Sequence, residues 1–157
     1  MGLFSFIKNA GSKLFGGKKE IEAPEVQQVV KTAEELKIEA LKSEINRLGL
    51  PVSNLNVELG TSVTVDGSTD TNADREKVIL ALGNVDGISV VQDNIYVTNP
   101  EPESTFHEVK SGDSLSKIAK EVYGDAMKYN IIFEANQPML SHPDKIYPGQ
   151  ILRIPVA

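Results

Sequence analysis

The sequence predicts an α+β protein made of two small domains. Short runs that alternate apolar and polar residues stand beside segments whose apolar residues recur at helical spacing, so the chain contains both strands and helices. Residues 98–104 interrupt both patterns with Pro100 and Pro102 among acids, and they predict a linker. A chain of 157 residues is long enough for a small core on each side of that linker.

The N-terminal residues 1–17 predict a short amphipathic helix, for which Gly11 offers one end and Gly16–Gly17 a firmer one. Its apolar face consists of Leu3, Ile7, Ala10 and Leu14. The alternative is a surface anchor on anionic lipid. We expect the helix to dock on the protein instead, because it is short and its few lysines give only weak attachment to lipid. Residues 18–35 are acidic and polar, and they predict a further helix or a mobile arm.

Residues 36–97 predict the first domain, in the order helix, strand, strand, helix, strand. The stripe of the first helix comprises Val29, Leu36, Leu41, Ile45 and Leu48. Alternating runs at 54–60 and 62–67 predict a β-hairpin. A second helix ends at Gly83, and residues 87–97 predict the third strand. We expect the helices to cover one face of a three-stranded sheet.

Residues 105–157 predict the second domain, in the order strand, helix, helix, strand. The segment "SGDSLSKIAKEVYG" opens with residues that cap helices, and apolar residues at helical spacing follow. Asp125 caps another helix. The segment "KIYPGQILRIP" then gives a Pro148–Gly149 turn into the last strand.

Three segments of this second domain closely resemble the LysM family: "VKSGDSLSKIAKEVYG", "IFEANQP" and "DKIYPGQILRIP". The resemblance covers Phe106 to Pro155 and implies a βααβ fold. It also implies a shallow groove for N-acetylglucosamine polymers, peptidoglycan or chitin, between the loop after the first strand and the loop after the second helix. The residues that match the groove are Gly112, Asp113, Ser114, Leu115, Asn136, Ile146, Tyr147 and Pro148. Turn, cap and core roles explain several of them equally well, since the motif identifies a fold rather than a function.

The first domain resembles a BON domain through its element order and its "VDG" and "LGNVDGI" turns. A BON unit followed by a LysM unit, behind the start "MGLFSFIKNAG", resembles the small bacterial potassium-binding proteins of the BON–LysM type. This resemblance implies a cytoplasmic, non-enzymatic protein that binds K⁺ in preference to Na⁺ and changes conformation on binding. The acidic insert between Gly16 and Ile38 is longer than the type suggests.

Backbone carbonyls suit K⁺, which is a large and weakly hydrated cation. The end of a helix offers unpaired carbonyls at the negative end of its dipole, and the two glycines of "LGNVDGI" let the backbone approach a ligand closely. The predicted ligands are the carbonyls of Ile7, Ala10, Gly83, Val85 and Ile88, with the side chains of Asn84 and Asp86 as weaker alternatives. We expect K⁺ to draw these segments together and to make the protein more compact.

Other functions find less support in the residues. The excess of acids over bases in residues 20–104 argues against a nucleic-acid partner there, and the lack of cysteine excludes disulfides and cysteine metal sites. His107 and His142 have no serine–acid constellation around them, and we expect no enzyme. The acidic run at 66–74 lacks the closing glutamate of a calcium loop and predicts a polar turn.

The N-terminus lacks the pattern of a signal peptide, and no apolar run is long enough to cross a membrane, so we expect a cytoplasmic protein. We expect it to be a monomer that serves as an ion sensor or buffer, linked to osmotic or potassium stress. The alternative is a wall-associated protein that binds glycan through its LysM groove. Whether a glycan or a protein partner occupies that groove stays open at this point.

Overall fold

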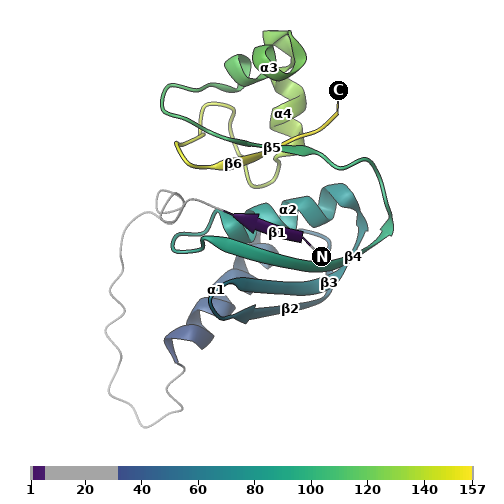
Figure 1. Cartoon of the computed structure of the whole chain (residues 1–157), viewed down its shortest axis with the longest axis vertical. Helices are drawn as coiled ribbons and strands as arrows, with labels where there is room; N and C mark the ends of the chain where they lie inside the picture. The colour runs from purple at the N-terminus through teal and green to yellow at the C-terminus, as the bar shows by residue number, and fades with distance from the viewer. Residues whose placement is uncertain (1, 6–31, 157) are drawn as a thin grey trace.

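The computed structural model describes residues 2–5 and 32–156. They form a four-stranded mixed sheet with two helices, followed by a smaller unit of two strands and two α-helices (Figure 1). The predicted α+β class and the division into two cores are therefore confirmed. Within this part of the chain, none of the helices has the length and apolarity needed to span a bilayer.

Helix α1 (Ala33–Leu48) begins at a capping box that the sequence prediction missed. The Thr32 hydroxyl accepts a hydrogen bond from the Glu35 N–H, and the Glu35 carboxylate accepts one from the Thr32 N–H. Gly49, with φ of 64°, ends the helix as predicted. Of the predicted stripe, Leu41 and Ile45 are buried, Leu48 is partly buried and Leu36 is exposed, while Val29 lies outside the described residues.

The predicted order of strands and helices in the first unit is confirmed. Its elements are β2 (Ser53–Leu59), β3 (Val63–Thr71), α2 (Asn72–Gly83) and β4 (Val90–Asn99). Strands β2 and β3 form the expected hairpin, and β3 pairs in parallel with β4 through the crossover helix α2. Both helices pack on one face of the sheet (Figure 1). The polar turn predicted at 66–74 is wrong, because β3 continues to Thr71 and Thr71 caps α2 directly.

The first residues form a strand, which corrects two predictions. Strand β1 (Gly2–Ser5) pairs antiparallel with β4, and the sheet has the order β1-β4-β3-β2 rather than three strands. A helix in this segment would leave the outer edge of β4 unpaired, whereas the strand satisfies backbone groups on both sides. Phe4 packs against the core while Leu3 faces solvent, as alternation in a strand requires. The remainder of the predicted helix, with Ile7, Ala10 and Leu14, lies outside the described residues.

The C-terminal unit has the predicted βααβ order. Its elements are β5 (Thr105–Glu108), α3 (Leu115–Tyr123), the 3₁₀ turn η2 (Ala126–Lys128), α4 (Tyr129–Ala135) and β6 (Ile151–Ile154). Strands β5 and β6 are antiparallel. The Ser114 hydroxyl caps α3 and the Asp125 carboxylate caps η2, as the sequence indicates. This unit lies beside α2 and the β1 edge of the larger sheet (Figure 1).

Two leucines of α1 test how the first core stabilises the fold. Leu41 is fully buried and Leu36 is 45% exposed, although both belong to the same helix. We expect Leu41→Ala to lower the free energy of unfolding by about 2–5 kcal/mol, because it removes buried methyl groups and leaves a cavity. Leu36→Ala is the matched control and should change it by less than about 0.5 kcal/mol. Urea unfolding followed by circular dichroism measures both, and equal losses would contradict this assignment of the core.

Candidate functional site

The "LGNVDGI" segment forms a tight turn at the C-terminal end of α2. The Asn84 N–H donates to the Leu80 carbonyl at 3.0 Å, and the Ile88 N–H donates to the Val85 carbonyl at 3.1 Å. Gly87 has φ of 84°, which a residue with a side chain rarely adopts. The turn therefore follows the negative end of the α2 dipole. The Val85 carbonyl is engaged by Ile88, but a carbonyl oxygen has a second lone pair available.

A cavity of about 190 Å³ lies beside this turn. Its walls come from the start of α1, the β2–β3 turn and the segment that leads into β4. The lining residues are Glu34, Lys37, Leu59, Gly60, Thr61, Ser62, Val63, Gly87, Ile88, Ser89 and Val90. Of the predicted ligand residues, Ile88 lines this cavity, whereas Gly83 and Val85 are not among its described lining residues.

The two charged residues of the cavity come from adjacent turns of α1. A Cβ atom placed on Gly87 would lie 3.0 Å from the Lys37 Nζ, so the ammonium group stands directly over the turn. Glu34 lies one helical turn before Lys37 and supplies the opposite charge. Within the described part of the chain, Lys37 forms no ion pair.

Strand β1 ends next to the same cavity. Ser5, its last residue, pairs with Val90, which is a lining residue. The predicted ligands Ile7 and Ala10 lie outside the described residues.

The side chains of the turn do not make a cluster of ligands. The Asn84 amide is 8% exposed and is bound to Ile151, and Asp86 is exposed. Among residues 2–5 and 32–156, no group of three or more His, Cys, Asp or Glu side chains is placed to hold a metal ion.

The two units meet through a buried ion pair. The Arg153 Nε of β6 lies 2.5 Å from Glu76 Oε2 of α2, and the two residues are 9% and 2% exposed. The second Glu76 oxygen accepts a hydrogen bond of 2.9 Å from the Ser104 N–H. Burial lowers the pKa of the neighbouring Lys77, and the Arg153 charge lowers it further.

Further contacts fasten the connection between the units. The rings of Phe4 and Phe106 meet edge to face, with centroids 5.4 Å apart. Arg75 forms ion pairs with Asp93 and Glu103, and the Asn72 amide donates to the Glu101 carbonyl. The predicted linker at 98–104 is therefore exposed up to Glu103 but tied to α2 by its bonds to Asn72 and Arg75. Strand β4 extends to Asn99, and Ser104 is buried against α2.

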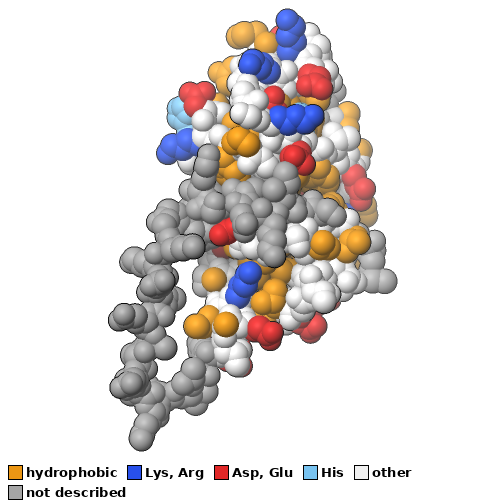
Figure 2. All heavy atoms as spheres, turned by 60° about the vertical axis from the view of Figure 1, so that its left-hand side comes forward, with side chains coloured by type: hydrophobic (Ala, Val, Ile, Leu, Met, Phe, Trp, Pro, Cys, Tyr) orange, Lys and Arg blue, Asp and Glu red, His pale blue; other side chains and the backbone are white. Residues whose placement is uncertain are grey.

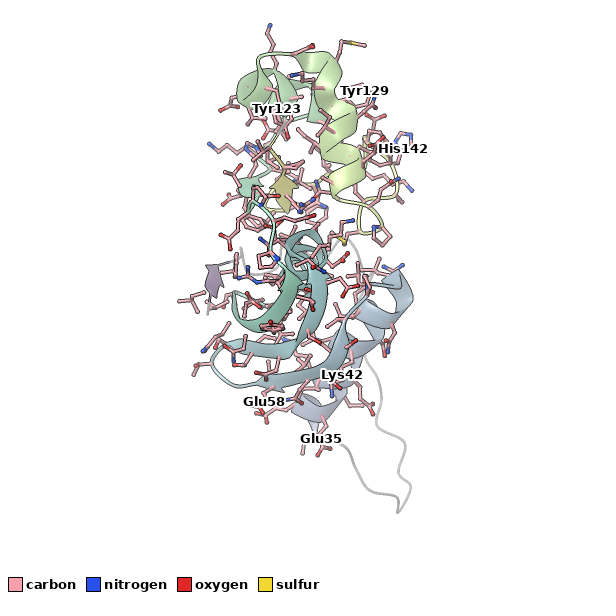
Figure 3. The ribbon with its side chains drawn as sticks, turned by 90° about the vertical axis from the view of Figure 1, so that its right-hand side faces the viewer. Glu35, Lys42, Glu58, Tyr123, Tyr129 and His142 are labelled. Atoms are coloured by element: carbon pink, nitrogen blue, oxygen red, sulfur yellow. The ribbon has the colours of Figure 1, made fainter. Side chains whose placement is uncertain are left out.

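The C-terminal unit contains a groove of about 430 Å³ on the side of the α3 N-terminus. Its lining residues are Ser114, Leu115, Ser116, Tyr129, His142, Pro143 and Asp144. Tyr129 and His142 lie on the same side of the unit, and Tyr123 lies away from them (Figure 3). On the face drawn in Figure 2, basic and acidic side chains are interspersed over this unit.

Only Ser114 and Leu115 of the eight predicted groove residues line this groove. Leu115, Asn136 and Tyr147 are buried, and the Asn136 amide is used by Arg153 and Ile132. Asn136 is thus a structural residue, because its polar atoms already have partners inside the protein. Asn136 is not among the lining residues of this groove.

The other predicted groove residues have mostly local roles. Asp113 accepts hydrogen bonds from the Lys110 N–H and from the His107 ring, and these bonds lower the pKa of its carboxyl group. The Gly112 carbonyl accepts a bond from the Lys117 ammonium. Ile146 packs against the core and Pro148 is exposed. The second wall of the groove comes instead from the loop at 142–144.

Comparison with known proteins agrees with this architecture. Residues 107–155 match the LysM domain family, which covers the βααβ unit. Along nearly its full length the chain is similar to the potassium binding protein Kbp of Escherichia coli O6:H1, with 42% identity over 162 residues that cover 99% of both chains. The chain belongs to the Kbp family. The Kbp family thus combines this LysM domain with the larger sheet.

The chain is also similar to a second protein, from Deinococcus radiodurans, which is described as an uncharacterized protein. The two are 32% identical over 150 residues, which cover 88% of this chain and 56% of the relative. The similarity therefore extends beyond the LysM domain, since 150 aligned residues must include most of the larger sheet.

The sequence prediction missed the residues that join the two units. Arg153 stands as a single charge in the apolar strand "ILRI", whereas Glu76 stands in the charged run "DREK". A lone charge inside an apolar run is a signal for Arg153, because a buried charge needs a buried partner, but Glu76 carries no such signal. The pattern cannot say which two charges meet, since they are separated by 77 residues.

Removal of one partner tests the ion pair. We expect Arg153→Met to lower the free energy of unfolding by about 3–5 kcal/mol, because it leaves the Glu76 carboxylate buried without a counter-charge. The double variant Glu76→Leu/Arg153→Met is the control and should recover most of this loss. Chemical unfolding of all three proteins measures it, and a double variant no more stable than Arg153→Met would contradict the pairing.

Proposed function

We propose that this chain is a potassium-ion-binding protein. The carrying observation is its similarity, at 42% identity over 99% of both chains, to a protein named for potassium binding. The turn after α2 supports the proposal, because it combines a left-handed glycine, the negative end of a helix dipole and an adjacent polar cavity.

The proposed ligands are the backbone carbonyls of two segments. Gly83, Val85 and Ile88 supply one set, and Ile7 and Ala10, which follow the end of β1, supply the other. The pairing of Ser5 with Val90 supports this choice, because it brings the end of β1 beside the segment that follows Ile88. Carbonyl dipoles can replace the water shell of K⁺ without adding a full negative charge.

We propose further that K⁺ makes the protein more compact. Two sets of carbonyl oxygens repel each other without a cation between them, so an ion that binds both favours the closed arrangement over an open one. Under this proposal the protein is a non-enzymatic sensor or buffer in the cytoplasm, its larger unit is a BON domain, and it responds to potassium or osmotic stress.

Glycan binding through the LysM domain is a second candidate function. The observation in its favour is the groove of about 430 Å³ with Tyr129 on its wall, because an aromatic ring can pack against the apolar face of a sugar. The two functions use different residues, so the same protein sample can test both.

Titration of K⁺, Na⁺ and a chitin oligomer into the purified full chain tests the two functions. We expect calorimetry to record heat of binding for K⁺ but not for an equal concentration of Na⁺. Small-angle scattering should record a smaller radius of gyration in K⁺ than in Na⁺. Binding of the chitin oligomer with no response to K⁺ would reject the first proposal in favour of the second.

The charged side chains of the cavity predict how substitutions change the affinity for K⁺. Lys37→Met removes a positive charge beside the turn, and we expect K⁺ to bind about three- to tenfold more tightly, since one charge at short range contributes about 1 kcal/mol near water. Glu34→Gln should weaken binding by a similar factor. Lys42→Met is the control, because Lys42 belongs to the same helix but does not line the cavity (Figure 3). Equal effects of Lys37→Met and Lys42→Met would place the ion elsewhere.

A further inference from the structure

The side chain of Asn84 connects the proposed cation turn to the LysM domain. Its amide nitrogen donates to the Ile151 carbonyl at 3.0 Å, and its amide oxygen accepts from the Ile151 N–H at 3.0 Å. Asn84 is the residue between Gly83 and Val85, and it caps α2. Asn84 therefore belongs to the turn through its backbone and binds a strand of the LysM domain through its side chain.

A second asparagine, Asn136, binds the backbone of β6 in the same way as Asn84. The Asn136 amide makes the same pair of bonds to Arg153, at 2.8 Å each, and Asn136 is the C-cap of α4. Alternate residues of a strand direct their N–H and C=O groups to the same edge, while β5 pairs with the opposite edge. Two asparagine amides thus take the place of a third strand. Asn136 belongs to the LysM domain itself, whereas Asn84 comes from the larger sheet.

We propose that Asn84 couples cation binding at the turn to the position of the LysM domain. This inference rests on the proposed function of the turn as a potassium site. The backbone of Asn84 lies between two of the proposed ligand carbonyls, and two hydrogen bonds fix the plane of its amide against Ile151. A carbonyl that reorients toward an ion rotates the adjacent peptide groups, so the amide of Asn84 moves with it.

The other contacts between the domains lack this connection to the turn. Glu76 meets Arg153 two helical turns before Gly83, and the contact between Phe4 and Phe106 involves no residue of the turn. They hold the LysM domain in place whether or not the turn changes. By thermodynamic linkage, if K⁺ binding strengthens or weakens the contact between Asn84 and Ile151, that contact strengthens or weakens K⁺ binding by the same factor.

The test is a titration of the full chain with K⁺, with Na⁺ as the reference, followed by the amide resonances in ¹H–¹⁵N NMR spectra. In the unmodified protein we expect K⁺ to shift the amides of Val85–Ile88 and also that of Ile151. In Asn84→Ala the turn should still respond and the Ile151 shift should be lost. Asn94→Ala is the matched control, because Asn94 is bonded to Asp66 within the larger sheet, and it should respond as the unmodified protein does.

Each outcome separates the coupling from the potassium site itself. Shifts at the turn without a shift at Ile151 in the unmodified protein, or an Ile151 shift retained in Asn84→Ala, overturn the coupling alone. No K⁺-dependent shift anywhere overturns the potassium site and the coupling with it. If Asn84→Ala fails to fold, Asn84→Asp is used, since a carboxylate still accepts from the Ile151 N–H but cannot donate to its carbonyl. A full Ile151 response in that variant overturns the proposal.

Discussion

The buried ion pair between Glu76 and Arg153 constrains most of the structure. A carboxylate that is 2% exposed on a core helix must find partners inside the protein, since an unpaired buried charge is strongly unfavourable. One oxygen takes the Ser104 N–H and the other takes the Arg153 guanidinium. These two interactions attach the connecting segment, at Ser104, and the last strand, at Arg153, to α2. The LysM domain is therefore held in one orientation by polar geometry as well as by apolar contact.

Helix α2 serves both domains because of this arrangement. Its apolar residues, among them Val78 and Ile79, fill the core under the sheet, and Glu76 supplies the ion pair. Its C-terminal residue and the turn that follows supply the proposed cation ligands and the Asn84 amide. A protein that responds to an ion needs its ion site near a contact that can change, and one helix end provides both. Under the proposed coupling, the contact between Asn84 and Ile151 links the LysM domain to the turn.

The groove and the cavity differ in place and chemistry. The groove lies on the LysM domain beside Ser114 and Tyr129, and the cavity lies at the end of the larger sheet, between Lys37 and Gly87. Neither shares a described lining residue with the other, so occupation of one need not block the other. The LysM domain can therefore contact the larger sheet through Arg153 without using the residues of its groove.

Local patterns in the sequence determined the fold class, the order of the elements from 36 to 157 and the turn at Gly83–Ile88, because caps, glycines and apolar spacing act over a few residues. They failed at Gly2–Ser5, where helical spacing gave way to pairing with the open edge of β4. They gave no sign that the Asn136 amide binds Arg153, which lies 17 residues further along the chain. Only the tertiary structure decided that Glu76 meets Arg153 and that Asn84 meets Ile151. Contacts between residues 67 or 77 positions apart leave no periodic signal, because the packing of whole elements selects them.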